Sequence, residues 1–265
     1  MLPLNPGASS GAQHNDRMEQ TGSKDIQHQV EVWIVDLAVN SEVLQQALTL
    51  LSRHEIETSN RLKFENLKNR YVVAHAVLRT LLAHYLQVLP QDLHFTCGPN
   101  GKPSLTHFPQ LRFNMSHSGT VAAFAFTSNC EIGIDLEGMR HVSDLPQIAS
   151  NFFSEAEKLD LAQVSGTAFE QAFYRGWVRK EAYVKAIGAG LLLAFASFRV
   201  SLLPNAPPRL LAISQGDAGA WALHSFKVGA HYVGAVAYRD RSRGISFLPR
   251  TDAARILATR SLPSV

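Results

Sequence analysis

Short β-branched runs and longer stretches with helical spacing alternate along the first half of the chain. Residues 30–39 (VEVWIVDLAV) predict an opening strand, because β-branched and apolar residues dominate there and strong helix formers are few. Residues 41–52 and 70–88 repeat apolar positions every three or four residues, which predicts two helices. Glycine and proline between residues 98 and 103 indicate a tight loop, and residues 111–128 predict two strands around a polar turn.

The second half repeats this order loosely. Residues 131–137 (EIGIDLE) predict a strand, and SEAE at residues 154–157 is typical of a capping box at the start of a helix. Residues 167–188 form the strongest helical pattern in the chain, which Gly188 ends. Further strands are expected at residues 197–203, 220–228 and 232–239.

Each half of the chain therefore combines strands with one long helix. This pattern predicts an α+β fold of two similar lobes related by a pseudo-twofold axis. The expected organisation is a flexible N-terminal tail at residues 1–28, an N-terminal lobe at 29–131, a C-terminal lobe at 132–240, and a C-terminal surface appendage at 241–265.

Composition limits the class of protein. Of the 265 residues 46% are hydrophobic, which provides ample material for a core, and the longest apolar run, residues 188–198, is too short to cross a bilayer. The formal net charge of +3 does not single out nucleic acid, although Lys and Arg concentrate between residues 53 and 79, which suits an anionic ligand. With only two cysteines and no secretory signal pattern, we expect a cytoplasmic protein without a membrane span.

The strand at residues 132–137 carries two carboxylates, Asp135 and Glu137, two positions apart. In an extended strand such residues project from the same face. Two adjacent carboxylates repel each other, and a hard divalent cation such as Mg²⁺ relieves that repulsion with its preference for oxygen ligands. The alternative is a strand end whose acidic residues face water.

The long helix adds three charged residues, Lys180, Glu181 and Lys185. Lys180 falls within the apolar face, so its ammonium must find an anion, and we expect it near the metal carboxylates. Glu181 and Lys185 lie along the edge of that face, where the alternative is a surface ion pair. A third carboxylate from Glu181 would complete the protein part of a Mg²⁺ site, and Lys185 would then reach a phosphate bound there.

Five motifs in this order resemble the 4′-phosphopantetheinyl transferases, in particular the monomeric, two-lobed type that activates peptide and polyketide synthases. The resemblance covers about residues 30–240. The motifs are GKP (101–103), FNMSHS (113–118), IGIDLE (132–137), FFSEAE (152–157) and FYRGWVRKEAYVKAIGAGL (173–191).

The resemblance implies an active site in the cleft between the lobes. There the 4′-phosphopantetheine arm of coenzyme A would pass to a serine of an apo acyl, aryl or peptidyl carrier protein, releasing adenosine 3′,5′-bisphosphate. By position, Asp135, Glu137 and Glu181 match the family's Mg²⁺ ligands. Lys185 matches its pyrophosphate-binding lysine, and Glu181, or a water held beside it, matches its candidate base.

The resemblance also implies contacts with coenzyme A. Ser116 and His117, within the motif that also contains Asn114, match residues at the phosphates, and Gly101 and Lys102 match the loop that lines the nucleotide pocket. The family commonly has a basic residue for the 3′-phosphate just before the first long helix, where this chain has Thr58. Arg61, Arg53 and Arg70 are the substitutes that we expect.

Two other functions remain compatible with the carboxylates. A Mg²⁺-dependent phosphodiesterase or nuclease can use the same residue types, but it predicts a broad basic surface with stacking aromatic residues, which this sequence does not show. A catalytically silent module that only binds carrier proteins predicts missing carboxylates, whereas all three are present.

Overall fold

The computed structural model describes residues 26–258 of the chain. Residues 1–25 of the expected tail and residues 259–265 of the expected appendage lie outside the described part. The elements of the first half are β1 (Gln29–Asp36), α1 (Ser41–Leu50), α2 (Arg53–Asn60), α3 (Glu65–Leu86), the 3₁₀ turn η1 (Pro90–Asp92), β2 (Phe95–Cys97), β3 (Pro103–Leu105), β4 (Leu111–Ser118) and β5 (Val121–Ser128).

The elements of the second half begin with the strand that carries the acidic motif. They are β6 (Ile132–Gly138), α4 (Leu145–Phe152), α5 (Glu155–Leu161), α6 (Gly166–Ile187), η2 (Gly190–Leu192), η3 (Phe195–Ser197), β7 (Arg199–Val200), β8 (Leu210–Ala212), η4 (Ala218–Ala220), β9 (Ala222–Val228), β10 (Tyr232–Tyr238), β11 (Gly244–Phe247), β12 (Thr251–Asp252) and α7 (Ala253–Ala258).

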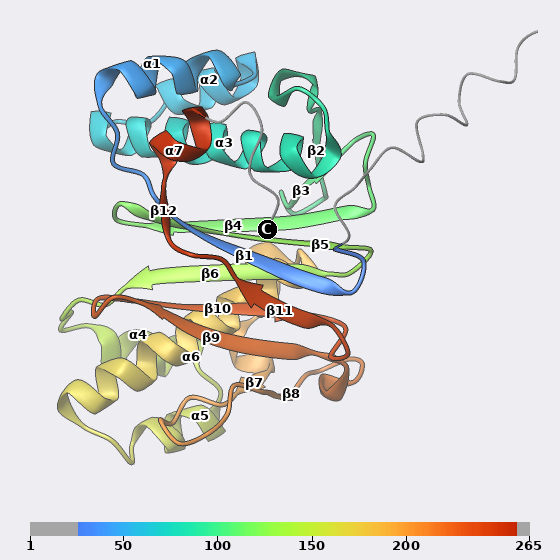
Figure 1. The fold of residues 1–265 in the computed structure, drawn as a ribbon. Coiled ribbons are helices and arrows are strands. Elements are labelled where there is room, and N and C mark those ends of the chain that lie inside the picture. Colours follow the sequence, from blue (N-terminus) through green and yellow to red (C-terminus); the bar gives the residue numbers. More distant parts are fainter. Residues whose placement is uncertain (1–25, 259–265) are drawn as a thin grey trace, which may run out of the picture.

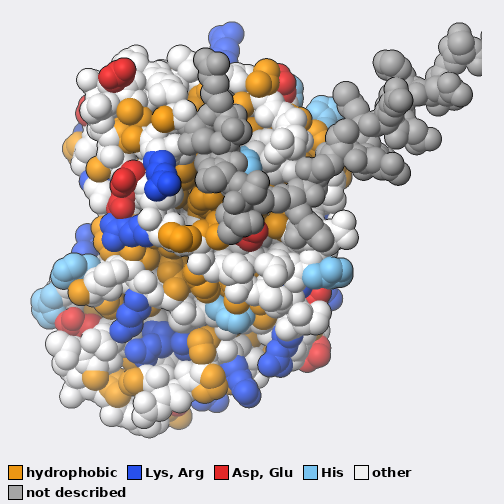
Figure 2. Space-filling model, in the orientation of Figure 1, with side chains coloured by type: hydrophobic (Ala, Val, Ile, Leu, Met, Phe, Trp, Pro, Cys, Tyr) orange, Lys and Arg blue, Asp and Glu red, His pale blue; other side chains and the backbone are white. Residues whose placement is uncertain are grey.

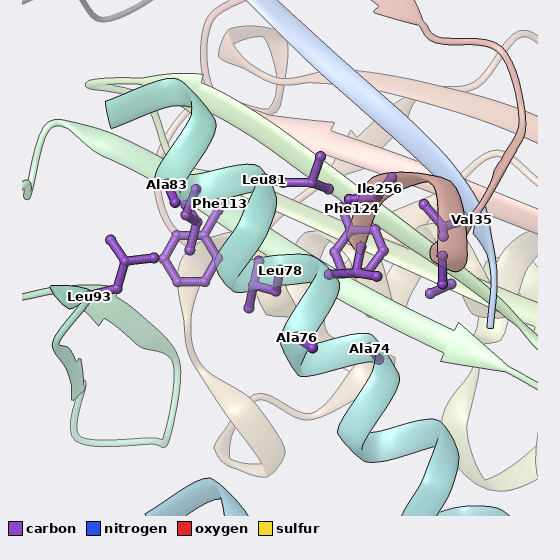
Figure 3. Packing of buried hydrophobic residues seen from close by; sticks show 14 of the residues in the cluster. Val35, Ala74, Ala76, Leu78, Leu81, Ala83, Leu93, Phe113, Phe124 and Ile256 are labelled. Carbon is purple, nitrogen blue, oxygen red and sulfur yellow. The ribbon is translucent and has the colours of Figure 1, made fainter. Parts of the chain in front are cut away.

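The first sheet has the strand order β11-β1-β5-β4, and β12 also pairs with β1. Adjacent residues of β5 point to opposite sides of this sheet, as in any strand. Phe124 faces the helices, where it packs in one cluster with Leu78 and Leu81 of α3 and with Phe113 of β4 (Figure 3). Ala123 faces the other way, toward the second sheet. The first sheet is therefore buried on both sides along β5.

The second sheet is antiparallel, with the order β6-β10-β9, and α6 packs against β6 and β10. Ile134 and Leu136 of β6 pack with Val32 of β1 in a cluster between the two sheets. The molecule thus has four layers, in which helices α1–α3 and α7 cover the first sheet and α4–α6 cover the second (Figure 1). The layers place β4 and β6, from different halves of the chain, beside each other.

Residues 241–258, the described part of the expected surface appendage, are packed against the rest of the fold. Strand β11 pairs in parallel with β1, and Ala253 and Ile256 of α7, 0% and 1% exposed, join the cluster under α3. A four-residue strand and a six-residue helix are too short to show a clear hydrophobic period, which is why the sequence pattern missed them. Apolar side chains remain exposed on the face shown in Figure 2, and Phe247 of β11 is 42% exposed.

Two other boundaries differ from the sequence prediction. Helix α3 begins at Glu65, earlier than expected. The hydrophobic pattern missed this start because the first turn of the helix is mostly polar. The strand expected at residues 197–203 is reduced to the 3₁₀ turn η3 and the two-residue β7. The capping box of Ser154 and Glu157 is confirmed, and so is the end of α6, where Gly188 has a left-handed φ of 65°.

Each half of the chain contributes one 22-residue helix, α3 or α6, packed on β-strands. The predicted α+β fold class is therefore confirmed. Among the helices of residues 26–258, none combines the length and the apolar character needed to cross a membrane.

Candidate active site

Strands β4 and β6 are joined by side chains rather than by a backbone ladder. Asn114, Ser116 and Ser118 occupy alternate positions of β4 and therefore share one face. Asn114 Oδ1 accepts a hydrogen bond from Ile134 N at 2.8 Å, and Ser118 Oγ accepts one from Gly138 N at 3.0 Å. We name this set of contacts the polar seam; it fixes β6, with its two carboxylates, against the first half of the chain.

Gly133 allows α6 to lie unusually close to β6. A Cβ atom at this position would be 2.1 Å from Ala182 O and 2.3 Å from Ala186 N, distances that no side chain could occupy. Asp135 and Glu137 project from the same face of β6 as Gly133. The missing side chain thus brings Glu181 and Lys185 of α6 to the face of β6 that bears the carboxylates.

Asp135 is 3% exposed, and its two oxygens differ in their surroundings. Oδ1 is 2.6 Å from Lys185 Nζ and accepts a hydrogen bond from Ser116 Oγ at 3.0 Å. Oδ2 is buried without a hydrogen-bond partner among the described residues. A buried carboxylate oxygen is costly to leave unpaired, so this atom marks a place that a cation would fill.

Glu137 and Glu181 line one cavity together with Asp135. It measures about 420 Å³ and is lined by Met115, Ser116, His117, Asp135, Glu137, Glu181 and Lys185. Burial raises the pKa of Glu181, and the negative charges of Asp135 and Glu137 raise it further, against the opposite effect of Lys185. Burial and the charge of Asp135 likewise raise the pKa of Glu137, to which Ser118 Oγ donates at 3.1 Å.

These carboxylates are an acidic set with a single nearby ammonium, that of Lys185. Oxygen donors that repel one another, together with the unpaired Asp135 Oδ2, fit a hard divalent cation by their chemistry. Within residues 26–258, however, no three His, Cys, Asp or Glu side chains stand in the arrangement of a formed metal-binding group. The side chains would therefore have to close around an ion.

His117 stands on the rim of this cavity, and two groups of the first half approach it. Desolvation and the positive charges of Lys185 and Arg70 lower the pKa of His117. His75 of α3 stacks on Tyr71 at 3.8 Å, and burial is the main cause that lowers the pKa of His75, with His117 contributing. The sequence pattern indicated Arg70 but gave no signal for His75, which lies five residues after Arg70 on the same helix.

Two of the expected coenzyme A contacts are already engaged with protein atoms. Asn114 is bound in the polar seam, and Lys102 Nζ donates to Ala186 O at 2.6 Å and to Ile132 O at 2.9 Å. Gly101, with a φ of 85°, and Lys102 nevertheless line a second cavity, of about 300 Å³, together with Glu181 and Lys185. No contact between the exposed Arg61 and these cavities occurs among the described residues.

Lys180 pairs with Glu157 and not with Asp135, Glu137 or Glu181, so our expectation for it was wrong. Its ammonium and the Glu157 carboxylate, both 0% exposed, lie 2.9 Å apart on the far side of α6. Lys180 Nζ also donates to Phe195 O and Phe198 O at 2.7 and 2.6 Å. The capping-box glutamate is the anion that this lysine required.

Comparison with known proteins agrees with the motifs. Residues 131–237 match the model of the 4′-phosphopantetheinyl transferase superfamily, and residues 38–129 match that of the 4′-phosphopantetheinyl transferase N-terminal region. The 4′-phosphopantetheinyl transferase HetI of Nostoc sp. is 34% identical over 212 residues, which cover 79% of this chain and 87% of HetI. The chain belongs to the 4′-phosphopantetheinyl transferase family.

Two further matches of this phosphopantetheinyl transferase have lower identities than HetI. The 4′-phosphopantetheinyl transferase Sfp of Bacillus subtilis is 30% identical over 168 residues, which cover 63% of this chain and 74% of Sfp. Among solved structures, a holo-(acyl-carrier-protein) synthase from Bacillus anthracis, in complex with coenzyme A (3′,5′-ADP), matches with a TM-score of 0.32 and 22% identity. That match covers 41% of this chain and 93% of the synthase.

The predicted family and enzyme class of this phosphopantetheinyl transferase are therefore confirmed. The structure brings Asp135, Glu137, Glu181 and Lys185 together at one cavity, with Ser116 and His117 beside them. Their individual roles in catalysis and binding stay predictions.

Proposed function

We propose that this enzyme transfers the 4′-phosphopantetheine arm of coenzyme A to a serine hydroxyl of an apo carrier protein, with Mg²⁺ bound by Asp135, Glu137 and Glu181. The observation that carries the proposal is the cavity at which three carboxylates from two elements meet Lys185, in a chain of this family. The coenzyme A and carrier protein named for the relatives supply the substrate class.

The reaction would break a phosphoanhydride bond of coenzyme A and form a phosphoester bond to the carrier. The serine oxygen of the carrier forms a bond to the phosphorus that bears the pantetheine arm, and the bond from that phosphorus to the bridging oxygen of the pyrophosphate breaks. Adenosine 3′,5′-bisphosphate leaves, and the serine proton must pass to a base. The bound cation would stabilise the negative charge on the phosphate oxygens and hold them in place.

Glu181 is our candidate for that base. Its carboxylate lies at the cavity, beside the place proposed for the cation, so Glu181 or a water that it holds there can accept the serine proton. Lys185 lies at the same cavity, with a side chain 29% exposed, so its ammonium can turn from Asp135 toward an entering phosphate. Ser116 Oγ, which donates to Asp135 and accepts from Lys185, would keep the two groups in register.

The binding of coenzyme A would draw on both halves of the chain. We assign the phosphates of coenzyme A to Lys185, Ser116 and His117. The 3′-phosphate would bind His117 together with Arg70, because the positive charge of Arg70 lies near enough to His117 to lower its pKa. The loop at Gly101 and Lys102 would form a wall of the nucleotide pocket through its backbone and aliphatic atoms. Arg61 is the weakest of the expected contacts, because it is exposed away from the cavities described above.

The test is to incubate the enzyme with coenzyme A, Mg²⁺ and a panel of apo carrier proteins, and to weigh each carrier by mass spectrometry. We expect a gain of one phosphopantetheine group that depends on Mg²⁺ and is lost on chelation. Glu181→Gln should lower the transfer rate by at least about 100-fold, as expected for loss of a general base, while Glu65→Gln, at an exposed site on α3, should not.

Absence of a mass gain with every carrier would contradict the proposal, and binding of the carrier without transfer would indicate a silent binding module. Cleavage of a single-stranded oligonucleotide by the same preparation, lost in Glu181→Gln, would favour the nuclease alternative. A cytoplasmic location and a monomeric state, without nucleic acid or membrane as partners, stay predictions.

A further inference from the structure

The loop between β2 and β3 is fastened to the C-terminal end of α6. Lys102, from the first half of the chain, donates to Ala186 O in the last turn of α6 and to Ile132 O at the start of β6. Asn100 Nδ2 donates to Gly188 O at 3.0 Å. These bonds connect a two-stranded hairpin to the helix that carries Glu181 and Lys185.

The end of α6 is suited to receive these donors. The last carbonyls of a helix have no partner within it, and the helix dipole favours positive charge there. Gly188 leaves the helix in a left-handed conformation, and a Cβ at this position would lie 3.2 Å from Lys102 Cδ. The lysine stem therefore fits against a residue without a side chain.

The same side chains separate two cavities. Asn100, Lys102, Pro103 and Gly188 line the cavity of about 300 Å³ that contains Glu181 and Lys185. They also line a cavity of about 560 Å³ on the other side, whose wall includes Arg112 and Glu131. Lys102 is thus part of the wall that these two cavities share.

We propose that Lys102 and Asn100 form a clamp between the two halves of the chain, which positions the C-terminal end of α6 and closes the cavity that receives coenzyme A. The proposal rests on the proposed function for its ligand, but the clamp itself is a property of the free protein. Lys102 acts as a positioning residue, not as the cation that binds a phosphate.

The two roles differ in the sign of their pH dependence. Burial lowers the pKa of Lys102 to about 8, with opposing contributions from Glu131 and Cys130, which raise it, and from Arg112, which lowers it. An unclamped lysine in water has a pKa of about 10.4. Because the clamped state has the lower pKa, protonation favours release, and the clamp tightens as the pH rises from about 8 toward 10. A neutral amine keeps two N–H donors, enough for both carbonyls.

Hydrogen exchange of the free protein tests the clamp directly. Lys102→Met should speed amide exchange in residues 98–103 and in the last turn of α6 by about tenfold near pH 9, the equivalent of two lost hydrogen bonds. Asn100→Ala should act on the same amides, and the double variant should show less than the product of the two effects because the groups share one loop. Lys227→Met, at an exposed site on β9, is the matched control.

Calorimetry of coenzyme A binding then separates the clamp from a direct contact. If Lys102 clamps, the loss of affinity in Lys102→Met grows between pH 7 and pH 9. If Lys102 binds a phosphate as a cation, the loss shrinks over that range, because the ammonium disappears, and the proposal is overturned. Unchanged exchange in both variants would also overturn it.

Failure of the proposed function would look different. In that case the wild-type protein transfers nothing to any carrier, while the exchange pattern of Lys102→Met still reports on the clamp.

Discussion

Removing the ammonium of Lys180 should destabilise the enzyme strongly without removing any of the proposed catalytic groups. The Lys180→Met variant keeps the length of the side chain but leaves the Glu157 carboxylate, 0% exposed, without its counter-charge. Loss of one partner of a buried ion pair costs about 3–5 kcal/mol. Glu157 keeps hydrogen bonds from Ser154 N and Oγ and from Val200 N, which places our expectation at the lower end, about 3 kcal/mol.

Several other contacts depend on the same ammonium. The carbonyls of Phe195 and Phe198 lose their donor, and the ring of Phe198, 4.1 Å from Nζ, loses its cation. Phe195 also lines the cavity beside Glu181 and Lys185. We therefore expect a fall in the melting temperature of roughly 10 °C, on the scale of about 2–4 °C per kcal/mol for a chain of this size, and some loss of transfer rate at temperatures where the variant is folded.

The assay is urea unfolding of four proteins: wild type, Lys180→Met, Glu157→Gln and the double variant. Glu157→Gln removes the negative charge while glutamine can still serve the capping box. Because the pair is coupled, the double variant should be more stable than the sum of the single losses predicts. The exposed pair of Lys158 and Glu155 on α5, changed in the same way, should cost less than about 1 kcal/mol. A cost of Lys180→Met below about 1 kcal/mol, or additive effects, would mean that the buried pair does not stabilise the fold in this way.

Three further changes test the site. Gly133→Ala puts a Cβ against the backbone of α6, so we expect a loss of stability of more than about 3 kcal/mol by thermal unfolding, whereas Gly244→Ala, with nothing nearer than 3.8 Å, should be tolerated. Asn114→Ala leaves the Ile134 N–H without its acceptor, which should cost about 1–3 kcal/mol in urea unfolding and lower transfer; an unchanged midpoint would contradict the polar seam. Glu137→Gln should raise the melting temperature of the metal-free protein at pH 7. The reason is that the pKa of Glu137 is raised on folding, so its ionisation reduces stability as the pH climbs above about 4.3. Mg²⁺ should stabilise the wild type more than the variant.

The local sequence pattern was sufficient to predict those helices and strands whose hydrophobic residues repeat with a clear period. The alternation in IGIDLE predicted that Asp135 and Glu137 share a face, and the long helical pattern predicted α6 with its end at Gly188. Such periods follow from the geometry of one strand or one helix, so they can be seen without knowledge of any partner. The short β11 and α7 lacked this signal, since each gains its stability from β1 or α3 rather than from its own residues.

Contacts between distant segments could not be obtained in this way. The sequence required an anion for Lys180, and we expected that anion among the three carboxylates of the candidate metal site. Only the packed structure showed that Lys180 pairs with the capping-box Glu157. Lys102 had the appearance of an exposed lysine in a glycine-proline turn, yet the fold directs it to the carbonyls at the end of α6. Both lysines are paired with groups more than 20 residues away or with backbone atoms, which carry no sequence signal.

The residues alone establish the α+β class, the family, and the residue types that meet at the candidate active site, because these depend on side-chain chemistry and on the spacing within single elements. The tertiary structure decided how the elements meet: Gly133 sets the distance of α6 from β6, the polar seam fixes the register of the two sheets, and the lysine contacts tie the loops to α6. The physical reason is that close packing and the pairing of buried polar groups are satisfied between elements, and a residue's partner is set by the folded chain and not by its neighbours in sequence.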